Sequence, residues 1–335
     1  MKLHRLVSAT PVLATCALLV GLFAFGAISY PNFASAAVVR NLLVDNAFLV
    51  VAAVGMTFVI ISGGIDLSVG AAMAFSATLA AALIEAGGVH PLAAAAVVLA
   101  AGLAFGLVQG VLIAVLDVPP FMVTLAGMFL ARGAAFAVHP QSRGITHPFV
   151  ATTLNETLAM HLPLGARGVT IPPTVVVMLL VLIGAWVLLR HARFGRAVYA
   201  VGDDACAARL MGLAVRRVKV GVYTLCGLTS AVAGLLFALY QQSGDPASCK
   251  GMELDVIAAV IIGGTLLRGG AGSVIGTFAG VMILGLIQTI ISFQGDLSSW
   301  WTRIVAGGLV LVFLLLHQGI GVVARRVGRT ADRQG

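Results

Sequence analysis

Acidic and amide side chains interrupt the apolar runs of this sequence at a few places. Asp66 and Ser68 stand in the stretch SGGIDLSVG, and Glu253 and Asp255 stand at the start of another apolar run. A carboxylate inside an apolar run that crosses a membrane is expensive, and it therefore indicates a function. Such groups can hydrogen-bond a hydroxyl-rich solute along a path. The candidate path residues are Asp66, Ser68, Gln109, Thr124, Glu253, Asp255 and Gln288.

Each of these residues also has a structural interpretation. Gly63 and Gly64 would end one helix, and Asp66 would then cap the next helix through amides near Ser68. An aspartate at a helix start also complements the positive end of the helix dipole. The amides and hydroxyls inside the other runs could equally bond a neighbouring helix. Both interpretations stay open, because a capped helix break can itself line a path.

The composition decides which elements must position these residues. Of the 335 residues, 60% are hydrophobic and only 10% are charged, and the mean hydropathy is +1.07. A soluble domain is normally nearer half apolar and one quarter charged. Forty glycines suit close helix packing in a bilayer. Because backbone groups in lipid need internal partners and the runs lack strand-like alternation, the sequence predicts an all-α, polytopic transmembrane helix bundle.

The apolar runs predict about ten spans, some of them short or broken. The first run is longer than the core of a cleavable signal peptide, so a retained span is expected there. The run at 254–267 is short enough to be either a full crossing or a re-entrant helix. The expected spans are 11–30, 42–62, 69–86, 91–116, 121–138, 172–189, 219–241, 254–267, 272–293 and 301–317.

The net charge of +8 follows the positive-inside pattern rather than a nucleic-acid-binding stripe. Lys2 and Arg5 precede the first span, residues 193–220 are Arg-rich, and residues 322–335 form a basic tail. An even number of spans places all three on the cytoplasmic side and residues 139–171 on the periplasmic side. We therefore expect one transmembrane domain over residues 1–335, with both termini cytoplasmic and a short surface helix within 139–171.

The Arg-rich segment reads RFGRAVYAVGDDACAARLMGLAVRRVKV. Residues 205–213 have helix-forming composition, and Asp203 or Asp204 can cap the N-terminus of this helix. Gly212 can end it as a C-cap. The segment is predicted to form a short helix between two turns at the cytoplasmic face. The alternative is an ordinary basic loop that only holds the topology.

Several chemistries are missing from the sequence. It has no G-x-x-x-x-G-K-[ST] phosphate loop, no H-E-x-x-H and no G-x-S-x-G, so ATP binding and hydrolase chemistry are not expected. The four cysteines and the histidines show no metal-ligand spacing. We expect no cofactor, no metal site and no catalytic residues.

Three blocks together resemble the permease family of ribose-type sugar importers driven by ATP (ABC importers). They are SGGIDLSVG, FGRAVYAVGDDACAARLMGL and ELDVIAAVIIGGTLLRGGAGSVIG, and the similarity runs through nearly the whole chain. Two further blocks, LAGMFLARG and LIQTIISFQGDLSSWWTRI, look like the galactofuranose-importer permease branch. The resemblance implies a permease that translocates a galactofuranose or ribose-like monosaccharide.

This resemblance also implies partners: ABC ATPase subunits, a second permease subunit and a periplasmic sugar-binding protein, in the bacterial inner membrane. The galactofuranose branch favours a heterodimer of permeases, and a homodimer stays open. The positions matching the family's ATPase-coupling segment are Gly195, Ala200, Gly202, Ala207, Ala208 and Gly212. The family more often carries Gly-Asn or similar where Asp203 and Asp204 stand, which leaves the ATPase contact itself open.

Two other functions compete with this one. A secondary sugar transporter would need buried acid, base or histidine pairs for ion coupling, and few charges lie mid-span. A membrane-embedded enzyme would need a convergent catalytic set, and Asp203-Asp204 is the only adjacent acidic pair. Both are weaker interpretations than a transporter subunit whose ATP is hydrolysed by a partner.

Overall fold

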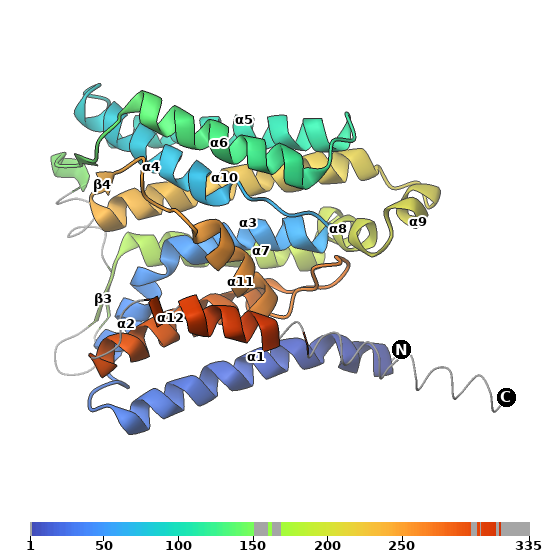
Figure 1. Cartoon of the computed structure of the whole chain (residues 1–335), viewed down its shortest axis with the longest axis horizontal. Coiled ribbons are helices and arrows are strands. Elements are labelled where there is room, and N and C mark those ends of the chain that lie inside the picture. The colour runs from blue at the N-terminus through green and yellow to red at the C-terminus, as the bar shows by residue number, and fades with distance from the viewer. Residues whose placement is uncertain are drawn as a thin grey trace.

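The protein is a helical bundle, described here from a computed structural model (Figure 1). The described residues are 2–150, 160–162, 169–295, 300–301, 303–312 and 315. The helices that span or enter the bundle are α1 (Lys2–Ser29), α2 (Ala36–Asp45), α3 (Ala47–Ile61), α4 (Val69–Glu85), α5 (Pro91–Ala114), α6 (Pro120–Val138), α7 (Pro173–His191), α10 (Val215–Gln241), α11 (Met252–Ile262) and α12 (Val274–Gln294).

Six of these helices are long and apolar enough to cross a membrane, and a seventh span results if the α2–α3 pair, bent by 51°, counts as one. The ten apolar runs of the sequence each coincide with a described helix, although only part of 301–317 is described. Within the described residues, six or seven candidate spans therefore replace the ten expected. Three runs account for the difference from seven. α4 and α11 are shorter than a full crossing, having 17 and 11 residues, and the described helix in 301–317 covers only Arg303–Val312.

Small residues allow the central helices to approach closely. Gly106 of α5 lies against the backbone of Gly227 on α10, and a Cβ added to Gly227 would lie 2.7 Å from the Gly106 Cα. A Cβ at Gly102 would lie 2.8 Å from the Gly227 carbonyl oxygen. This small-residue seam places α10 in the middle of the bundle, as membrane helices without a hydrophobic driving force require.

Two helices, α4 and α11, begin inside the bundle instead of at one of its ends (Figure 1). After α3, residues 62–68 run back into the bundle as an extended segment before α4 starts. After β4 (Ser243–Gly244), a loop likewise enters the bundle before α11 starts. Such discontinuous helices are tolerated at membrane depth only where protein or a water-filled cavity shields the free backbone groups.

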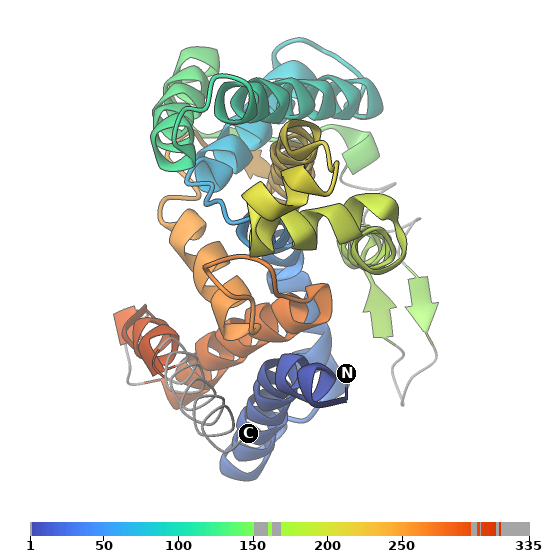
Figure 2. The same cartoon turned by 90° about the vertical axis from the view of Figure 1, so that its right-hand side faces the viewer.

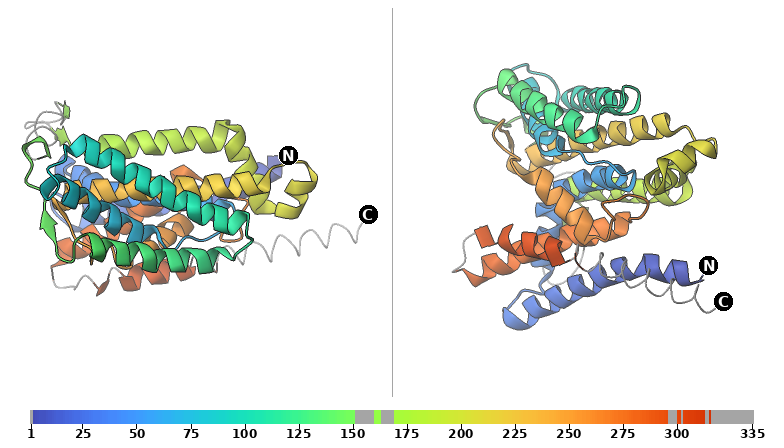
Figure 3. Two further views of the ribbon diagram at one scale, coloured as in Figure 1. Left: turned by 90° about the horizontal axis from the view of Figure 1, so that it is seen from above. Right: turned by 45° about the vertical axis from the view of Figure 1, so that its right-hand side comes forward.

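One end of the bundle carries the Arg-rich segment and the start of α1 (Figures 1 and 3). Here α8 (Arg193–Asp203) leads to α9 (Ala205–Leu210), which extends beyond the bundle. The Asp204 carboxylate accepts hydrogen bonds from the amides of Cys206 and Ala207 at 2.8 and 3.0 Å. Gly212 follows α9 with a φ of 83°. The predicted short helix and its glycine end are confirmed, and Asp204 is the capping residue of the two that were expected. The turn expected before this helix is wrong, because residues 193–203 form α8.

Short strands occupy the opposite end of the bundle. β1 (Arg143–Gly144) pairs antiparallel with β4, and β2 (Met160–Leu162) pairs antiparallel with β3 (Val169–Ile171). Strands of two or three residues leave no periodic signal in the sequence, which explains why they were not predicted. The surface helix expected in this segment falls largely on residues 151–159 and 163–168, which lie outside the described part, as does the basic tail at 322–335.

Glu85, the last residue of α4, fastens the segment that follows α6. Its carboxylate accepts hydrogen bonds from the Thr146 amide at 2.5 Å, the Thr146 hydroxyl at 3.0 Å and the His147 amide at 3.0 Å. These donors lower the pKa of Glu85 below its ordinary value of 4.5, with the Thr146 amide as the largest cause. The carboxylate thus ties the 143–147 segment to the end of α4.

We expect this tie to depend on pH in one direction. Because the pKa is lowered in the folded state, the stabilisation is present above about 4.5 and is lost as the pH falls through the folded-state value. Amide protection factors for Thr146 and His147 should therefore fall on acidification. In Glu85→Gln they should be lower at neutral pH and constant over that range. Hydrogen–deuterium exchange measures both, and wild-type protection that persists to pH 3 would contradict the prediction.

Candidate functional site

The start of α4 gathers the polar residues singled out in the sequence. The Asp66 Oδ1 atom accepts hydrogen bonds from the Ser68 amide at 2.8 Å and from the Ser68 hydroxyl at 2.6 Å. Asp66 is 3% exposed and Ser68 is 1% exposed. Ser68 is the N-cap residue of α4, and among the described residues no side chain caps the amides of the first turn. Asp66 therefore bonds the residue at the helix start and does not form the expected N-cap itself.

Two neighbouring helices add their polar side chains to this point. Gln109 of α5 donates from Nε2 to the Ser68 hydroxyl at 3.0 Å. Thr124 of α6 donates to the Pro120 carbonyl at 2.9 Å and lies 3.4 Å from the Ile65 carbonyl oxygen. Both side chains are buried. The α4 break is therefore linked to α5 by side-chain hydrogen bonds and meets α6 closely.

Glu253 reaches the same turn of α4 from the other side. Its Oε1 atom accepts a hydrogen bond from the Gly251 amide at 3.3 Å at the start of α11. Its Oε2 atom is buried next to Gly70 and has no hydrogen-bond partner among the described residues. A carboxylate here complements the positive ends of both α4 and α11, which start side by side. We call Asp66, Ser68, Gln109, Thr124 and Glu253 the α4 entry cluster.

The remaining two candidates lie elsewhere. Asp255 is half-buried one turn into α11, where it interacts electrostatically with Arg303 and Glu253. Gln288 is exposed on α12, and its carbonyl accepts a hydrogen bond from the Ser292 hydroxyl at 2.9 Å. The structure thus brings five of the seven candidate path residues together, with Asp255 adjacent and Gln288 apart.

Two residues that position this cluster were missed in the sequence. Cys226 of α10 is buried and interacts electrostatically with the Asp66 carboxyl group, although its sequence context indicated only a packing thiol. Arg132 of α6 donates to the carbonyls of Pro246 and Ser248 at 2.8 and 2.5 Å and so holds the loop that enters α11. A lone arginine inside an apolar run was the available signal for the second of these.

The coupling-segment candidates divide between an inner and an outer face. Gly195 and Ala208 are buried, and Gly202 lies against the carbonyl oxygen of Ile61. Ala200 is half-buried, while Ala207 and Gly212 are exposed on α9 and after it.

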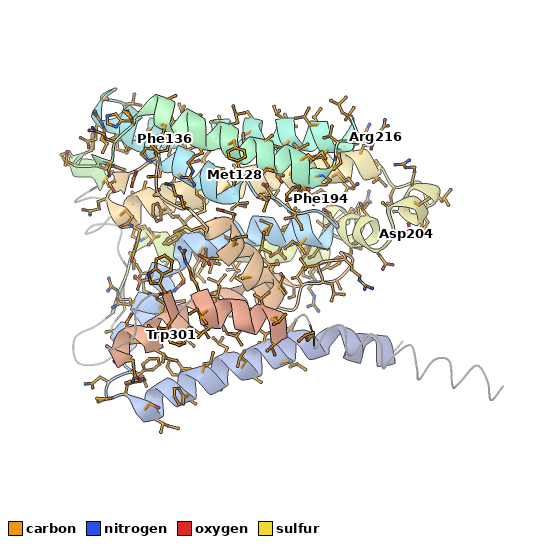
Figure 4. All side chains as sticks on the ribbon, viewed as in Figure 1. Met128, Phe136, Phe194, Asp204, Arg216 and Trp301 are labelled. Atoms are coloured by element: carbon orange, nitrogen blue, oxygen red, sulfur yellow. The ribbon has the colours of Figure 1, made fainter. Side chains whose placement is uncertain are left out.

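Leu210, the last residue of α9, and Met211, which follows it, are 85% and 70% exposed. Neither residue was singled out in the sequence. Figure 4 shows the same exposed end at Asp204. α9 therefore presents small and apolar side chains away from the bundle.

No chemistry beyond hydrogen bonding is evident at the cluster. Among the described residues no group of three or more histidine, cysteine or acidic side chains could hold a metal ion. Phe136 on α6 and Trp301 beyond α12 are exposed aromatic side chains (Figure 4). Tyr223 of α10, by contrast, is buried next to Gly64 and interacts electrostatically with Asp66. The cluster can hydrogen-bond a polar solute through its carboxylate, amide and hydroxyl groups.

A multi-pass helical bundle whose discontinuous helices begin at buried acidic and amide groups is the architecture of a membrane transport protein. Residues 38–314 match the family described as "Branched-chain amino acid transport system / permease component". Since this match covers most of the sequence, the chain belongs to that permease family.

Its relatives include sugar importer components. The chain is 45% identical over 91% of its length to the inner membrane ABC transporter permease protein YjfF of Escherichia coli, covering 92% of that protein. It is 38% identical to the E. coli ribose import permease RbsC, over 85% of this chain and 87% of RbsC. It is 32% identical to the fructose import permease FruG of Bifidobacterium longum, over 93% and 92%. No solved structure matches the chain.

The contact between α4 and α11 yields a stability prediction. A Cβ in Gly70→Ala would meet the Glu253 carboxylate and would lie 2.8 Å from the Cys249 carbonyl oxygen, which is backbone and cannot rotate away. We expect a loss of about 1–3 kcal/mol in stability from this overpacking. The measurement is the thermal unfolding midpoint of the purified protein in detergent.

Gly133→Ala is the matched control, because Gly133 is a helical glycine of α6 with nothing within 4 Å of its added Cβ. Alanine is favoured over glycine in a helix by roughly 1 kcal/mol, so this variant should be as stable as wild type or more so. Equal midpoints for Gly70→Ala and Gly133→Ala would show that α4 and α11 do not meet as described.

Proposed function

We propose that this chain is the membrane permease subunit of an ATP-driven sugar importer. The observation that carries the proposal is the family membership, with relatives named as ribose and fructose import permeases. The sequence lacks a phosphate loop, so ATP hydrolysis belongs to partner ATPase subunits, and a periplasmic binding protein delivers the sugar. The permease resides in the bacterial inner membrane, as the name of YjfF states for that relative.

The sugar passes beside the α4 entry cluster in this proposal. Asp66, Gln109 and Glu253 supply carboxylate and amide groups at the starts of α4 and α11, where discontinuous helices of transporters hold their cargo. Glu253 has a carboxylate oxygen without a partner, which could accept a sugar hydroxyl once the helices separate. Asp66 and Gln109 are linked through the Ser68 hydroxyl, and in this proposal they exchange that partner for a sugar hydroxyl.

The end that carries α8 and α9 faces the cytoplasm in this proposal. It holds the start of α1 and the Arg-rich segment, in agreement with the positive-inside rule. The strand-bearing end, which includes the described parts of 139–171, then faces the periplasm and the binding protein. The apolar tip of α9 at Leu210 and Met211 fits a groove on an ATPase subunit, and small residues such as Ala207 permit close approach.

The proposed cargo is a monosaccharide, with galactofuranose first and a ribose-like sugar second. The first choice rests on the blocks LAGMFLARG and LIQTIISFQGDLSSWWTRI, and the second rests on the likeness to RbsC. A heterodimer with a related permease follows from the galactofuranose branch.

The uptake of labelled sugars tests the importer function directly. Cells that lack the gene are compared with complemented cells, with galactofuranose and ribose among the sugars. Complementation should restore the uptake of one sugar, and inactivation of the partner ATPase should abolish the restored uptake. Restored uptake that survives ATPase inactivation but collapses with an uncoupler would instead identify a secondary transporter. If no sugar is taken up differently, the galactofuranose assignment is wrong.

The exposed tip of α9 gives a second test. Leu210→Glu places a charge on a side chain that is 85% exposed, so the folded permease should tolerate it. The same charge would be desolvated in an apolar groove of the ATPase, where an unpaired charge costs several kcal/mol. We expect at least a tenfold loss of ATPase copurification, with unchanged thermal stability. Leu210→Met is the matched control and should copurify normally; equal copurification of both variants would remove α9 from the interface.

A further inference from the structure

The inner side of α8 meets the ends of two other helices at one point. α3 ends at Ile61, and α11 is followed by a loop of residues 263–273 that leads into α12. In Figure 2 this orange loop lies beside the yellow-green α8 at the end of the bundle that faces the viewer. Segments separated by about 60 to 210 positions in the sequence therefore share one small contact region.

Backbone atoms of all three segments touch there. The Gly270 amide donates a hydrogen bond to the Ile61 carbonyl at 2.9 Å. A Cβ added to Gly202 of α8 would overlap that carbonyl oxygen and would lie 2.7 Å from the Gly270 nitrogen. A Cβ added to Gly269 would lie 2.7 Å from the Gly202 carbonyl oxygen and 3.0 Å from the Gly63 nitrogen. Glycine at position 202 is thus what lets α8 reach the other two backbones.

Side chains fasten the same contact on either side. The Tyr199 hydroxyl donates to the Gly272 carbonyl at 2.7 Å, and burial raises the pKa of Tyr199 above its ordinary value of 10.0, which keeps it protonated as a donor. Phe194 stacks on Phe58 of α3 with ring centroids 6.3 Å apart (Figure 4). α8 is consequently bound to the end of α3 through one ring pair and to the 263–273 loop through one hydrogen bond.

Both fastened segments lead to the α4 entry cluster. The Ile61 end of α3 continues through residues 62–68 to Asp66 and Ser68. The 263–273 loop adjoins the C-terminal end of α11, an 11-residue helix whose first turn holds Glu253. A displacement of α8 therefore moves the segments that carry both halves of the cluster, because packed helices shift as units rather than deform.

We propose that Gly202 and Tyr199 are positioning residues that couple movement of α8–α9 to the breaks at 62–68 and 263–273. The inference rests on the proposed function, because an ATPase partner must supply the movement. It assigns to α8 a role that is separate from docking: α9 binds the partner, and the Gly202–Ile61–Gly270 contact transmits the shift. Loss of this contact should leave partner binding intact and should reduce transport for each ATP hydrolysed.

The test uses the complete complex copurified through this chain. Tyr199→Phe removes one hydrogen bond, and Tyr30→Phe is its matched control, because the Tyr30 hydroxyl donates to Gln294 at 2.5 Å far from α8. Gly202→Ala introduces the backbone overlap, and Gly184→Ala of α7, with nothing within 4 Å of its Cβ, is the control. Hydrogen–deuterium exchange is compared with and without a non-hydrolysable ATP analogue.

In the wild type, the analogue should change exchange in α8–α9 and also at the Gly270 amide and residues 62–70. In Tyr199→Phe the change should remain in α8–α9 and shrink roughly two- to tenfold at the breaks, as expected for loss of one hydrogen bond. Sugar uptake per ATP should fall by a similar factor, with ATPase copurification and unfolding midpoints unchanged. Gly202→Ala should show the larger effect if it assembles, and Tyr199→Phe suffices if it does not.

Each failure has its own signature. If the analogue alters α8–α9 in the wild type but leaves the breaks unchanged, or if Tyr199→Phe transmits the change as fully as Tyr30→Phe, the positioning role is wrong and the importer function stands. If no ATPase copurifies and the analogue alters nothing in the wild type, the proposed function itself fails and the positioning role fails with it.

Discussion

The structure depends on one constraint: backbone N–H and C=O groups inside a bilayer must find partners within the protein. Continuous helices meet this requirement by themselves, whereas α3–α4 and α11–α12 each interrupt the helical ladder. The interruptions are stabilised by specific bonds, such as the Gly270 amide to the Ile61 carbonyl and the Ser68 amide to the Asp66 carboxylate. The first of these bonds joins the segments that follow α3 and α11, and the second lies where α4 starts. Both hold helix breaks inside an apolar bundle.

The same constraint explains why the acidic residues have structural and functional interpretations that do not compete. Asp66 occupies a free amide at the start of α4, and Glu253 occupies another at the start of α11. A group that completes a helix start inside the bundle necessarily faces the gap between helices, since that gap is where the ladder is missing. Capping and lining a path are thus two consequences of one position. The Oε2 atom of Glu253 has no hydrogen-bond partner among the described residues, so it can still accept a hydrogen bond.

Local features of this fold could be predicted from the sequence, and contacts between distant segments could not. Apolar runs predicted the positions of the long helices. The Asp204 cap and the Gly212 end of α9 could be predicted because capping acts over only three or four residues. The meeting of Gly202, Ile61 and Gly270 has no such signal, because a glycine in a helix indicates close packing without naming the partner. Cys226 was taken for a packing thiol for the same reason, since its interaction with Asp66 spans 160 positions. The short length of α4 and α11 was visible in their runs, but whether they cross the bilayer depends on these distant contacts.

Separate residues for docking and for transmission follow from the geometry of α8 and α9. Leu210 and Met211 at the tip of α9 are 85% and 70% exposed, so changes of these side chains introduce little strain inside the bundle. The inner face of α8 is different, because a single added methyl group at Gly202 meets backbone on two other segments. The proposed docking and positioning roles therefore fall on residues that can be changed independently of one another. The departure of Asp203-Asp204 from the family's usual residues lies at the boundary between the two, where α8 ends and α9 begins.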